Sequence, residues 1–312
     1  MKRGAELLSS FDRSWKEFSK NWQKARAKGS EKAIHGLRVN TRRCIAVLDL
    51  AQALSRRDGI PKLQHRFKKV LKGMGALRDI QVQLEKVSGI PETPLIAEFK
   101  ERLKSREQRE LKRLHDQLTR DTKNRLSKNI KRLLSELSDA EESFTNSRVQ
   151  RAVERVLISR RNQFQKAERR FRRLVPSDEE ALHEMRIALK KMRYVVEAAL
   201  PLLGESAKER ARQMRALQQL MGESRDLEML RAELEKWAGK KGKKIAIVPA
   251  LQDLQEKREA LIKKILELPS PDFKDLIPSR TAKLVAETTL AVRVAMDARS
   301  DRVEYPALRP GK

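Results

Sequence analysis

The chain has only one cysteine, Cys44, among its 312 residues. A single cysteine excludes an internal disulfide and any zinc site built from several cysteines. Cys44 lies among apolar neighbours, and we expect it to be a small buried core residue. The four histidines are scattered at positions 35, 65, 115 and 183, so no pair has the spacing of a metal site. The sequence therefore predicts no metal ion and no cofactor.

Aromatic residues and long apolar runs are also scarce. Aromatic side chains make up 4% of the chain, and Trp15, Trp22 and Trp237 each fall within an amphipathic pattern typical of core or interface packing. No segment approaches the about 20 apolar residues of a transmembrane helix. The first residues also lack the apolar stretch of a signal peptide. These absences predict a soluble, cytoplasmic protein.

Basic residues, in contrast, are abundant. Lysine and arginine number 71 against 43 acidic residues, which gives a net charge of +28. Charged residues reach 37% of the chain, whereas about 25% is usual for globular proteins. A field of this sign and size attracts polyanions. The candidate partners are therefore nucleic acid, an anionic membrane surface and phosphate polymers.

The apolar residues recur at helical spacing. Leu111, Leu114 and Leu118, for example, lie three and four residues apart, as expected for one face of a helix. The only candidate strand, Lys244–Val248, is followed by Pro249, and we interpret it as a loop that enters a helix. Ser30 is a good N-cap for the helix that follows it. Breaks at glycine and proline leave eight or nine helices, so we predict an all-α fold.

Two motifs occur twice, in the same order and at nearly the same distance along the chain. The segment HGLRVNTRR from His35 reappears as HEMRIALKK from His183. The segment MGALRD, which ends at Asp79, reappears as MGESRD, which ends at Asp226. Such ordered self-similarity indicates an internal duplication. We predict one repeat over residues 1–140 and a second over residues 141–312.

The repeated cations share one face of each helix. At 100° per residue, Arg38 and Arg42 lie on one line with His35 and Asp49, beside an apolar stripe. The second copy has the same arrangement, with Arg186, Lys190 and Glu197 following His183, and Arg193 adds a cation at the border of the line. The stripes could be solvated faces stabilised by ion pairs within the helix. Because the residue types are kept in both copies, we favour a binding surface.

The helix before each Gly-x-x-Arg-Asp segment adds further cations. His65, Lys68 and Lys72 share a face there, and their counterparts are Arg212, Arg215 and Gln219. If this helix packs antiparallel to the striped helix, both sets of cations border one groove. Within the repeated segment, we expect Gly75 and Gly222 to allow a close helix approach or a kink. We expect Asp79 and Asp226 to orient a neighbouring arginine.

These repeated motifs resemble the CHAD family, the conserved histidine α-helical domain, over roughly residues 5–300. The resemblance implies two four-helix bundles related by a pseudo-twofold axis, with a basic central cavity between them. It also implies binding of inorganic polyphosphate and association with polyphosphate granules. By motif matching, the site would be lined by Arg38, Arg42, Lys68 and Lys72 in the first repeat, by Arg186, Lys190, Arg193 and Arg215 in the second, and by His35 and His183 beside them. The two histidines are either phosphate donors or structural groups.

Three functions fit the composition. The first is non-catalytic binding of polyphosphate, which needs dense cations and no stacking surface. The second is nucleic-acid binding, which would act at low salt through the backbone charge alone, since aromatic platforms are few. The third is an enzyme, but Gly239–Lys244 lacks the spacing of a phosphate-binding loop, and no clustered carboxylates occur. We therefore predict polyphosphate binding without catalytic residues, with nucleic-acid binding as the alternative; the sequence indicates no protein partner.

Overall fold

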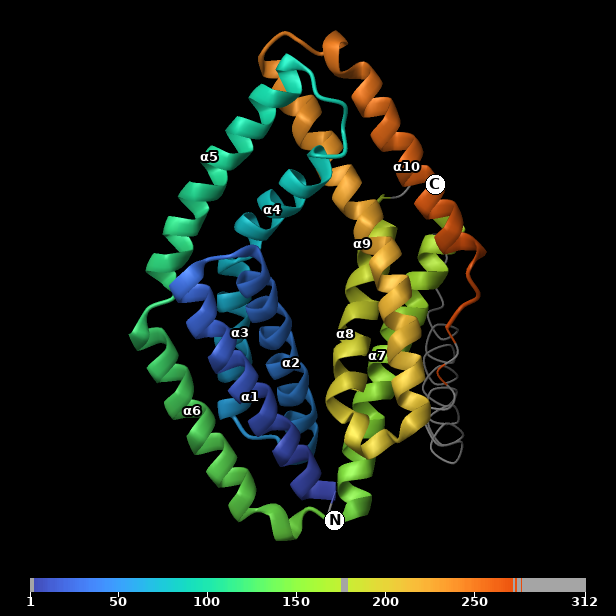
Figure 1. The fold of residues 1–312 in the computed structure, drawn as a ribbon. Helices are drawn as coiled ribbons and strands as arrows, with labels where there is room; N and C mark the ends of the chain where they lie inside the picture. The colour runs from blue at the N-terminus through green and yellow to red at the C-terminus, as the bar shows by residue number, and fades with distance from the viewer. Residues whose placement is uncertain (1–2, 175–178, 272, 274–275, 277–312) are drawn as a thin grey trace, which may run out of the picture. The chain divides into compact units, whose positions relative to one another are not determined.

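A computed structural model describes residues 3–174, 179–271, 273 and 276. The chain divides into two compact units, residues 1–271 and 272–312, and the following description concerns the first. Its described residues form ten α-helices and two short 3-10 helices, with no strand among them (Figure 1). The all-α prediction is confirmed for this part of the chain. None of the described helices is long and apolar enough to cross a bilayer.

The helices follow one another with short connections. The first six are α1 (Arg3–Lys28), α2 (Glu31–Ser55), α3 (Gly59–Gly73), α4 (Gly75–Val87), α5 (Pro94–Gln117) and α6 (Arg120–Asp139). The remaining elements are η1 (Glu141–Ser143), α7 (Asn146–Leu174), α8 (Glu179–Leu203), α9 (Glu205–Lys240), η2 (Ile245–Ile247) and α10 (Val248–Glu267). The predicted boundary between the repeats falls in the connection from α6 to α7.

Local signals at two helix starts are confirmed. Ser30 precedes α2 with extended backbone, and its hydroxyl accepts a hydrogen bond from the Ala33 backbone N–H at 3.4 Å. This bond satisfies one of the N–H groups that a helix leaves free at its start. The segment Lys244–Val248 forms a 3-10 turn that leads into α10, as predicted, and no strand.

The helix break at Leu118 was not predicted, whereas a kink was one of the two alternatives predicted at the repeated glycine. Met74 separates α3 from α4 between Gly73 and Gly75, whereas Gly222 lies inside the uninterrupted α9. A second break, at Leu118, separates α5 from α6. No atom lies within 4 Å of the position that a Cβ would take on Gly75 or Gly222. The predicted close helix approach is therefore wrong, and a break occurs only at Gly75, where two glycines flank one residue and weaken the helix.

Helices from the first half of the chain pack around an aromatic core. α1 lies against α2, α2 against α3, and α6 contacts both α1 and α3 (Figure 1). Phe18 of α1 lies at the centre, with its ring 5.1 Å from Phe67 of α3 and 5.3 Å from Trp15. Trp15, Trp22 and Trp237 are all buried, as predicted.

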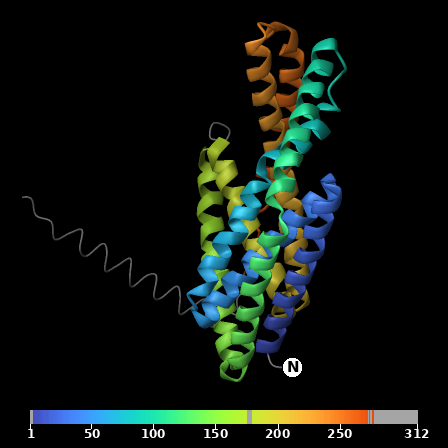
Figure 2. The same ribbon diagram turned by 90° about the vertical axis from the view of Figure 1, so that its left-hand side faces the viewer.

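The helices after α6 pack in chain order, α7 on α8, α8 on α9 and α9 on α10. Contacts of α2 with α7 and α8, and of α1 with α8, join them to the preceding helices. A separate apolar cluster unites α4 and α5 with the end of α9 and with α10, which gather in Figure 2. Phe99 and Trp237 meet there at 5.2 Å. The two striped helices, α2 and α8, thus lie side by side in the interior of the unit.

We expect the Phe67→Ala substitution to lower the free energy of unfolding by about 3–5 kcal/mol, because it leaves a cavity in a packed core. Phe67 is fully buried against Phe18. Urea unfolding followed by circular dichroism measures the loss. The exposed Lys62→Ala change on the same helix is the control, with an expected effect within about 0.5 kcal/mol. An unchanged midpoint for Phe67→Ala would show that α3 is not part of the core.

Candidate functional site

The packing of α2 on α8 brings the two predicted cationic stripes together. Arg38 and Arg42 of α2 and Arg186 of α8 all lie close enough to Lys190 to act on its ionisation. Arg42 is in turn affected by the charge of Arg186. All four side chains are partly buried. We call Arg38, Arg42, Arg186 and Lys190 the central cluster.

The central cluster has no direct counter-charge. Among the described residues, no carboxylate oxygen lies within 4.0 Å of any of its four cationic groups. Arg38 Nη1 donates to the Leu71 carbonyl of α3, and Arg42 Nη1 donates to the Arg38 carbonyl, each at 3.4 Å. The hydroxyl of Tyr194 interacts with Arg42 and favours its charged form. The guanidinium groups are thus held in place by neutral oxygens, which leaves their charge available to an anion.

Burial and mutual repulsion raise the free energy of the charged forms of these side chains. Burial, followed by the charges of Arg42, Arg186, Arg38 and Arg193, lowers the pKa of Lys190 to about 6. Burial and the Arg42 charge likewise lower the pKa of Arg38 to about 10. Burial also lowers the pKa values of Arg42 and Arg186. Lys190 is therefore mostly neutral at pH 7 in the free protein, while the three arginines stay charged.

Two carboxylates act on the cluster from a distance. Burial raises the pKa of Asp79 and of Asp226. Nearby arginines oppose that shift, with Arg38 the strongest for Asp79 and Arg186 the strongest for Asp226. Neither carboxylate makes a hydrogen bond or ion pair to an arginine in the described part of the chain. The predicted role of these two residues, orienting a neighbouring arginine, would therefore have to act through charge and not through a direct bond. They moderate the positive potential without neutralising any one cation.

A second set of cations is firmly paired around Glu197, whose side chain is only 9% exposed. Arg193 donates to Glu197, Arg215 lies 3.0 Å from it and Arg43 of α2 lies 3.9 Å from it. Arg193 is 6% exposed, also donates to Gln218 at 2.8 Å and lies over the ring of Tyr194. The structure thus brings Arg193 next to the cluster, but as a paired and buried group.

The corresponding acid of the first repeat is also paired. Asp49 of α2 lies 2.5 Å from Arg160 of α7 and accepts a hydrogen bond from Gln64 at 2.8 Å. The two acidic residues predicted to follow the stripes therefore link the repeats, since Asp49 joins α2 to α7 and Glu197 joins α8 to α2. Their partners Arg160 and Arg43 come from other helices, so these ion pairs orient the helices that carry the cluster.

The two predicted histidines flank the cluster as neutral groups. Burial and the charges of Arg78, Arg42 and Arg38 lower the pKa of His35, and burial with Arg225 and Arg186 lowers that of His183. His35 is exposed, whereas His183 Nδ1 is buried and has no hydrogen-bond partner among the described residues. A neutral imidazole carries one N–H donor. Each ring can therefore donate to an anion without adding charge.

The remaining predicted residues, Lys68, Lys72 and Arg215, are exposed. The bond from Arg38 to the Leu71 carbonyl places α3 beside the cluster, between Lys68 and Lys72. Arg215 is 63% exposed although it pairs with Glu197. The structure thus surrounds a buried group of cations with exposed ones.

Sequence reasoning missed three residues of this region. Tyr194 contacts both Arg42 and Arg193, but its counterpart in the first repeat is Ala46, so the duplication gives no signal for it. Arg78 and Arg225 act on the histidines, and their repeated Gly-x-x-Arg-Asp segment could have indicated them.

We expect Lys190→Met to stabilise the protein at pH 7. The pKa of Lys190 is about 6 in the folded state, whereas the ordinary pKa of a lysine, which applies to the unfolded state, is 10.5. The unfolded state therefore binds more protons between these pH values. The stability of the natural protein therefore falls as the pH decreases from about 10.5 towards 6, and the variant lacks this loss. Urea unfolding at pH 7 and pH 10 should show an advantage of the variant that shrinks at the higher pH. Lys191→Met, exposed on the same helix, should show no such dependence, and equal curves for both variants would contradict the assignment.

Comparisons with known proteins place this arrangement in a family. The family model described as the CHAD domain matches residues 10–235. The crystal structure of the CHAD domain from the plant Ricinus communis superposes with a TM-score of 0.65 and 17% sequence identity, over 87% of this chain and 94% of that one. PptA from Streptomyces chartreusis superposes with a TM-score of 0.59 and 17% identity, over 86% of this chain and 98% of that one. No curated protein matches the chain.

The two structural likenesses, at this low identity, concern the fold alone. The family match is of a different kind, because it spans well over half of the chain and includes both repeated segments, from His35 and from His183. The cations in these two matched segments are the ones that α2 and α8 bring together. The chain therefore belongs to the CHAD domain family.

Proposed function

We propose that this protein binds inorganic polyphosphate, without catalysis, at the central cluster. CHAD domains are known for polyphosphate binding. The observation that carries the proposal for this chain is the central cluster, four partly buried basic side chains on facing helices with no described carboxylate within 4.0 Å. Phosphate oxygens would supply the missing counter-charge, and charge-assisted hydrogen bonds to guanidinium groups are among the strongest in proteins.

The exposed cations around the cluster support a polymeric anion over a small one. Lys68 and Lys72 lie on α3 beside Arg38, and Arg215 lies on α9 beyond Glu197. A chain of phosphates can contact the buried cations and the exposed ones at the same time, whereas one phosphate ion cannot. We assign Arg193 to holding Glu197 and Tyr194 in place at the site's wall. His35 and His183 add neutral donors at its border.

The proposal includes the duplication and its consequences. We infer that residues 1–140 and 141–312 are two repeats, each built as a four-helix bundle, with the basic cavity between them. The pairing of α2 with α8, which carry the matching segments, supports this inference. Association with polyphosphate granules would follow from binding of long chains.

Nucleic acid is the alternative polyanion. All three tryptophans are buried, so they offer no platform on which bases could stack. Backbone charge would then be the only means of binding, and we expect nucleic acid to bind weakly and at low salt. An enzyme is not proposed, because Asp79 and Asp226, the carboxylates near the cluster, are surrounded by arginines.

We expect the double change Arg38→Gln and Arg42→Gln to weaken binding of long-chain polyphosphate at least about tenfold. Each lost charged hydrogen bond is worth about 1.5–3 kcal/mol, and 1.4 kcal/mol is a factor of ten. Lys191→Gln with Lys240→Gln removes the same charge from exposed positions and serves as control. Fluorescence polarisation with labelled polyphosphate measures both. Equal losses in the two variants would mean diffuse attraction by the net charge.

Binding should take up a proton at neutral pH. A bound phosphate favours the charged form of Lys190, whose pKa is about 6 in the free protein. Affinity should therefore fall as the pH rises from 6 to 8. Calorimetry in buffers of different ionisation enthalpy measures the uptake, and Lys190→Met should reduce it. If the Lys190→Met variant takes up as many protons as the natural protein, the proton binds to another group.

Polyphosphate should displace nucleic acid but not the reverse. At near-physiological salt and matched phosphate concentration, we expect single- and double-stranded nucleic acid to compete poorly with labelled polyphosphate. Affinity for polyphosphate should also fall as salt increases, because each phosphate contact releases counterions. If nucleic acid competes equally, charge alone explains binding and the alternative function is the correct one.

A further inference from the structure

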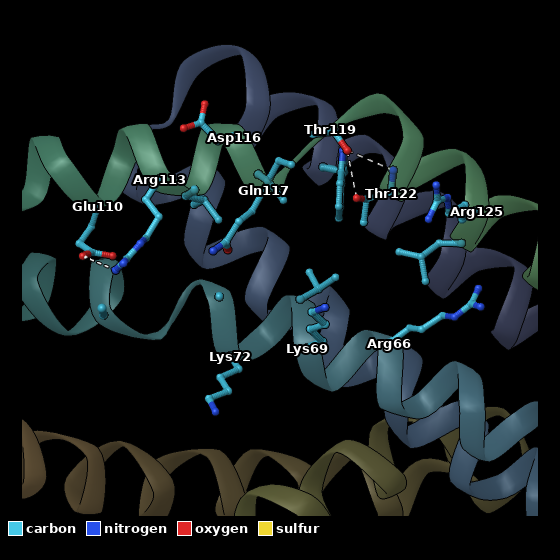
Figure 3. A pocket seen from close by; sticks show the side chains of 17 residues that line it. Arg66, Lys69, Lys72, Glu110, Arg113, Asp116, Gln117, Thr119, Thr122 and Arg125 are labelled. Carbon is cyan, nitrogen blue, oxygen red and sulfur yellow. Dashed lines mark hydrogen bonds and ion pairs between the residues drawn. The ribbon is translucent and has the colours of Figure 1, made fainter.

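A groove lies between α3 and α6, apart from the central cluster. A cavity of about 560 Å³ joins the start of α3 to the end of α6, and one of about 840 Å³ joins the end of α3 to the start of α6 (Figure 3). Arg66 lines both cavities, so they form one continuous groove along α3. None of the four residues of the central cluster lines either cavity. We call this surface the α3–α6 groove.

α3 presents a row of cations to this groove. Lys62, Arg66 and Lys69 line it, and at 100° per residue they lie within about 60° of one another around the helix axis. The rise of the helix separates them by about 6 and 4.5 Å along that axis. Lys68 and Lys72, which we predicted for the central site, lie about 100° further around α3. One helix therefore carries two rows of cations on two faces.

α6 supplies the opposite wall of the groove. Arg125 lines the larger cavity, and Arg132, two helical turns further along α6, lines the smaller one. Figure 3 shows Arg66 and Arg125 on opposite walls at the same end of the larger cavity. Arg132 lies 2.8 Å from Glu136, which is also 3.2 Å from Arg57. Glu136 thus pairs with two arginines of the smaller cavity, whereas Arg125 has no carboxylate within 4.0 Å among the described residues.

The acidic residues of the groove leave most of its positive charge unpaired. Glu110 is paired with Arg113 at 3.2 Å. Asp116 lines the larger cavity, but Figure 3 shows its carboxylate pointing away from α3. Asp58 lines the smaller cavity beside the start of α3. Besides Lys72, the exposed groove cations with no described carboxylate within 4.0 Å are Arg56, Lys62, Arg66, Lys69 and Arg125. A groove with this charge attracts an anion that extends along it.

The walls of the groove favour an anion that carries charge on every unit and has no aromatic part. Trp22 is the one aromatic residue among the described residues that line it, and it is only 1% exposed. Nucleic-acid bases would therefore find no surface on which to stack. Inorganic polyphosphate needs no such surface. The spacing of the α3 cations allows each of them to contact a different phosphate of one chain.

We propose that the α3–α6 groove holds a second stretch of the polyphosphate chain that occupies the central cluster. α3 lies between the two surfaces, since Arg38 of the cluster donates to the Leu71 carbonyl of α3 at 3.4 Å. Lys72 lines the larger cavity, yet Figure 3 shows its side chain pointing away from α5 and α6. Lys72 therefore marks the place where a chain would pass from one surface to the other. The inference rests on the proposed function and adds a second contact for the same polymer.

Only a long chain can make both contacts. A second contact by the same polymer is intramolecular, so it strengthens binding without a second ligand. Tripolyphosphate is too short to pass around a helix of about 10 Å diameter. The groove should therefore contribute to binding of long-chain polyphosphate and not to binding of tripolyphosphate.

The test is fluorescence polarisation with the full chain and labelled long-chain polyphosphate. We expect the triple change Arg66→Gln, Lys69→Gln and Arg125→Gln, the groove variant, to weaken binding at least about tenfold, because it removes the second contact. Binding of tripolyphosphate, measured by calorimetry, should be the same in the groove variant and in the natural protein.

The matched control is the triple change Lys112→Gln, Lys128→Gln and Lys131→Gln. It removes the same charge from exposed positions on α5 and α6 that lie outside both cavities. At near-physiological salt, where distant exposed charges are screened, it should weaken long-chain binding less than about twofold. Equal losses in the groove variant and the control would overturn the inference.

Lysine acetylation read by mass spectrometry locates the contact directly. Long-chain polyphosphate should protect Lys62 and Lys69 from acetylation and leave Lys128 and Lys131 reactive, although all four are exposed in the free protein. Tripolyphosphate should protect neither pair. Equal protection of all four lysines would mean that the chain follows the net charge and would contradict a contact confined to the groove.

The same variants separate this inference from the proposed function. If Arg38→Gln with Arg42→Gln loses long-chain binding and the groove variant keeps it, the groove is not a site and the proposed function stands. If the groove variant loses binding and the Arg38 and Arg42 variant keeps it, polyphosphate binds at the groove and the proposed central site is wrong. Single-stranded nucleic acid that displaces polyphosphate from the natural chain but not from the groove variant would show that the groove binds nucleic acid, which would also overturn the inference.

Discussion

The repulsion among four basic side chains held side by side on α2 and α8, which leaves Lys190 mostly neutral at pH 7, is the constraint on which the rest of the structure depends. Arg38, Arg42, Arg186 and Lys190 are partly buried and have no described carboxylate within 4.0 Å. Such an arrangement costs folding free energy, and the low pKa of Lys190 is a direct sign of that cost. A protein that only needed a stable helical core would place these residues in water. Binding sites, in contrast, often keep charge unpaired until the ligand arrives.

The surrounding fold offsets this cost with paired charges and apolar packing. Glu197, buried beside the cluster, pairs with Arg193, Arg215 and Arg43, and Asp49 pairs with Arg160. Except for Arg193, which lies on α8 with Glu197, the partners come from different helices, so these ion pairs keep α2, α7 and α8 in register while the cluster pushes them apart. The aromatic packing around Phe18 holds α1 and α3 on the other side of α2. Paired and unpaired cations thus have different roles within a few ångströms of each other.

The repeated segment has a different backbone conformation in each of its two copies. MGALRD interrupts the helix between α3 and α4, whereas MGESRD continues inside α9. The break turns α4 and α5 away from α3, and α5 then returns through Leu118 into α6. That return places the end of α5 and the start of α6 over α3, where a cavity of about 840 Å³ forms. The difference in backbone between the two copies of the segment thus positions the helices that border this cavity.

Helical class, the cationic stripes and the family were predictable from the sequence, because each depends on local spacing. A period near 3.6 residues places Arg38 and Arg42 on one face wherever the helix lies, and the repeated motifs can be compared without coordinates. Which cations stay unpaired was decided only by the tertiary structure. Arg193 borders the stripe that carries Arg186, yet Arg193 meets Glu197, whereas Arg186 has no carboxylate within 4.0 Å among the described residues. The role of Tyr194 and the cavity between α3, α5 and α6 were equally hidden, since the residues that complete them come from helices far apart in the chain. Which cations form ion pairs depends on which sides of the helices are in contact. The packing of the whole core determines those contacts.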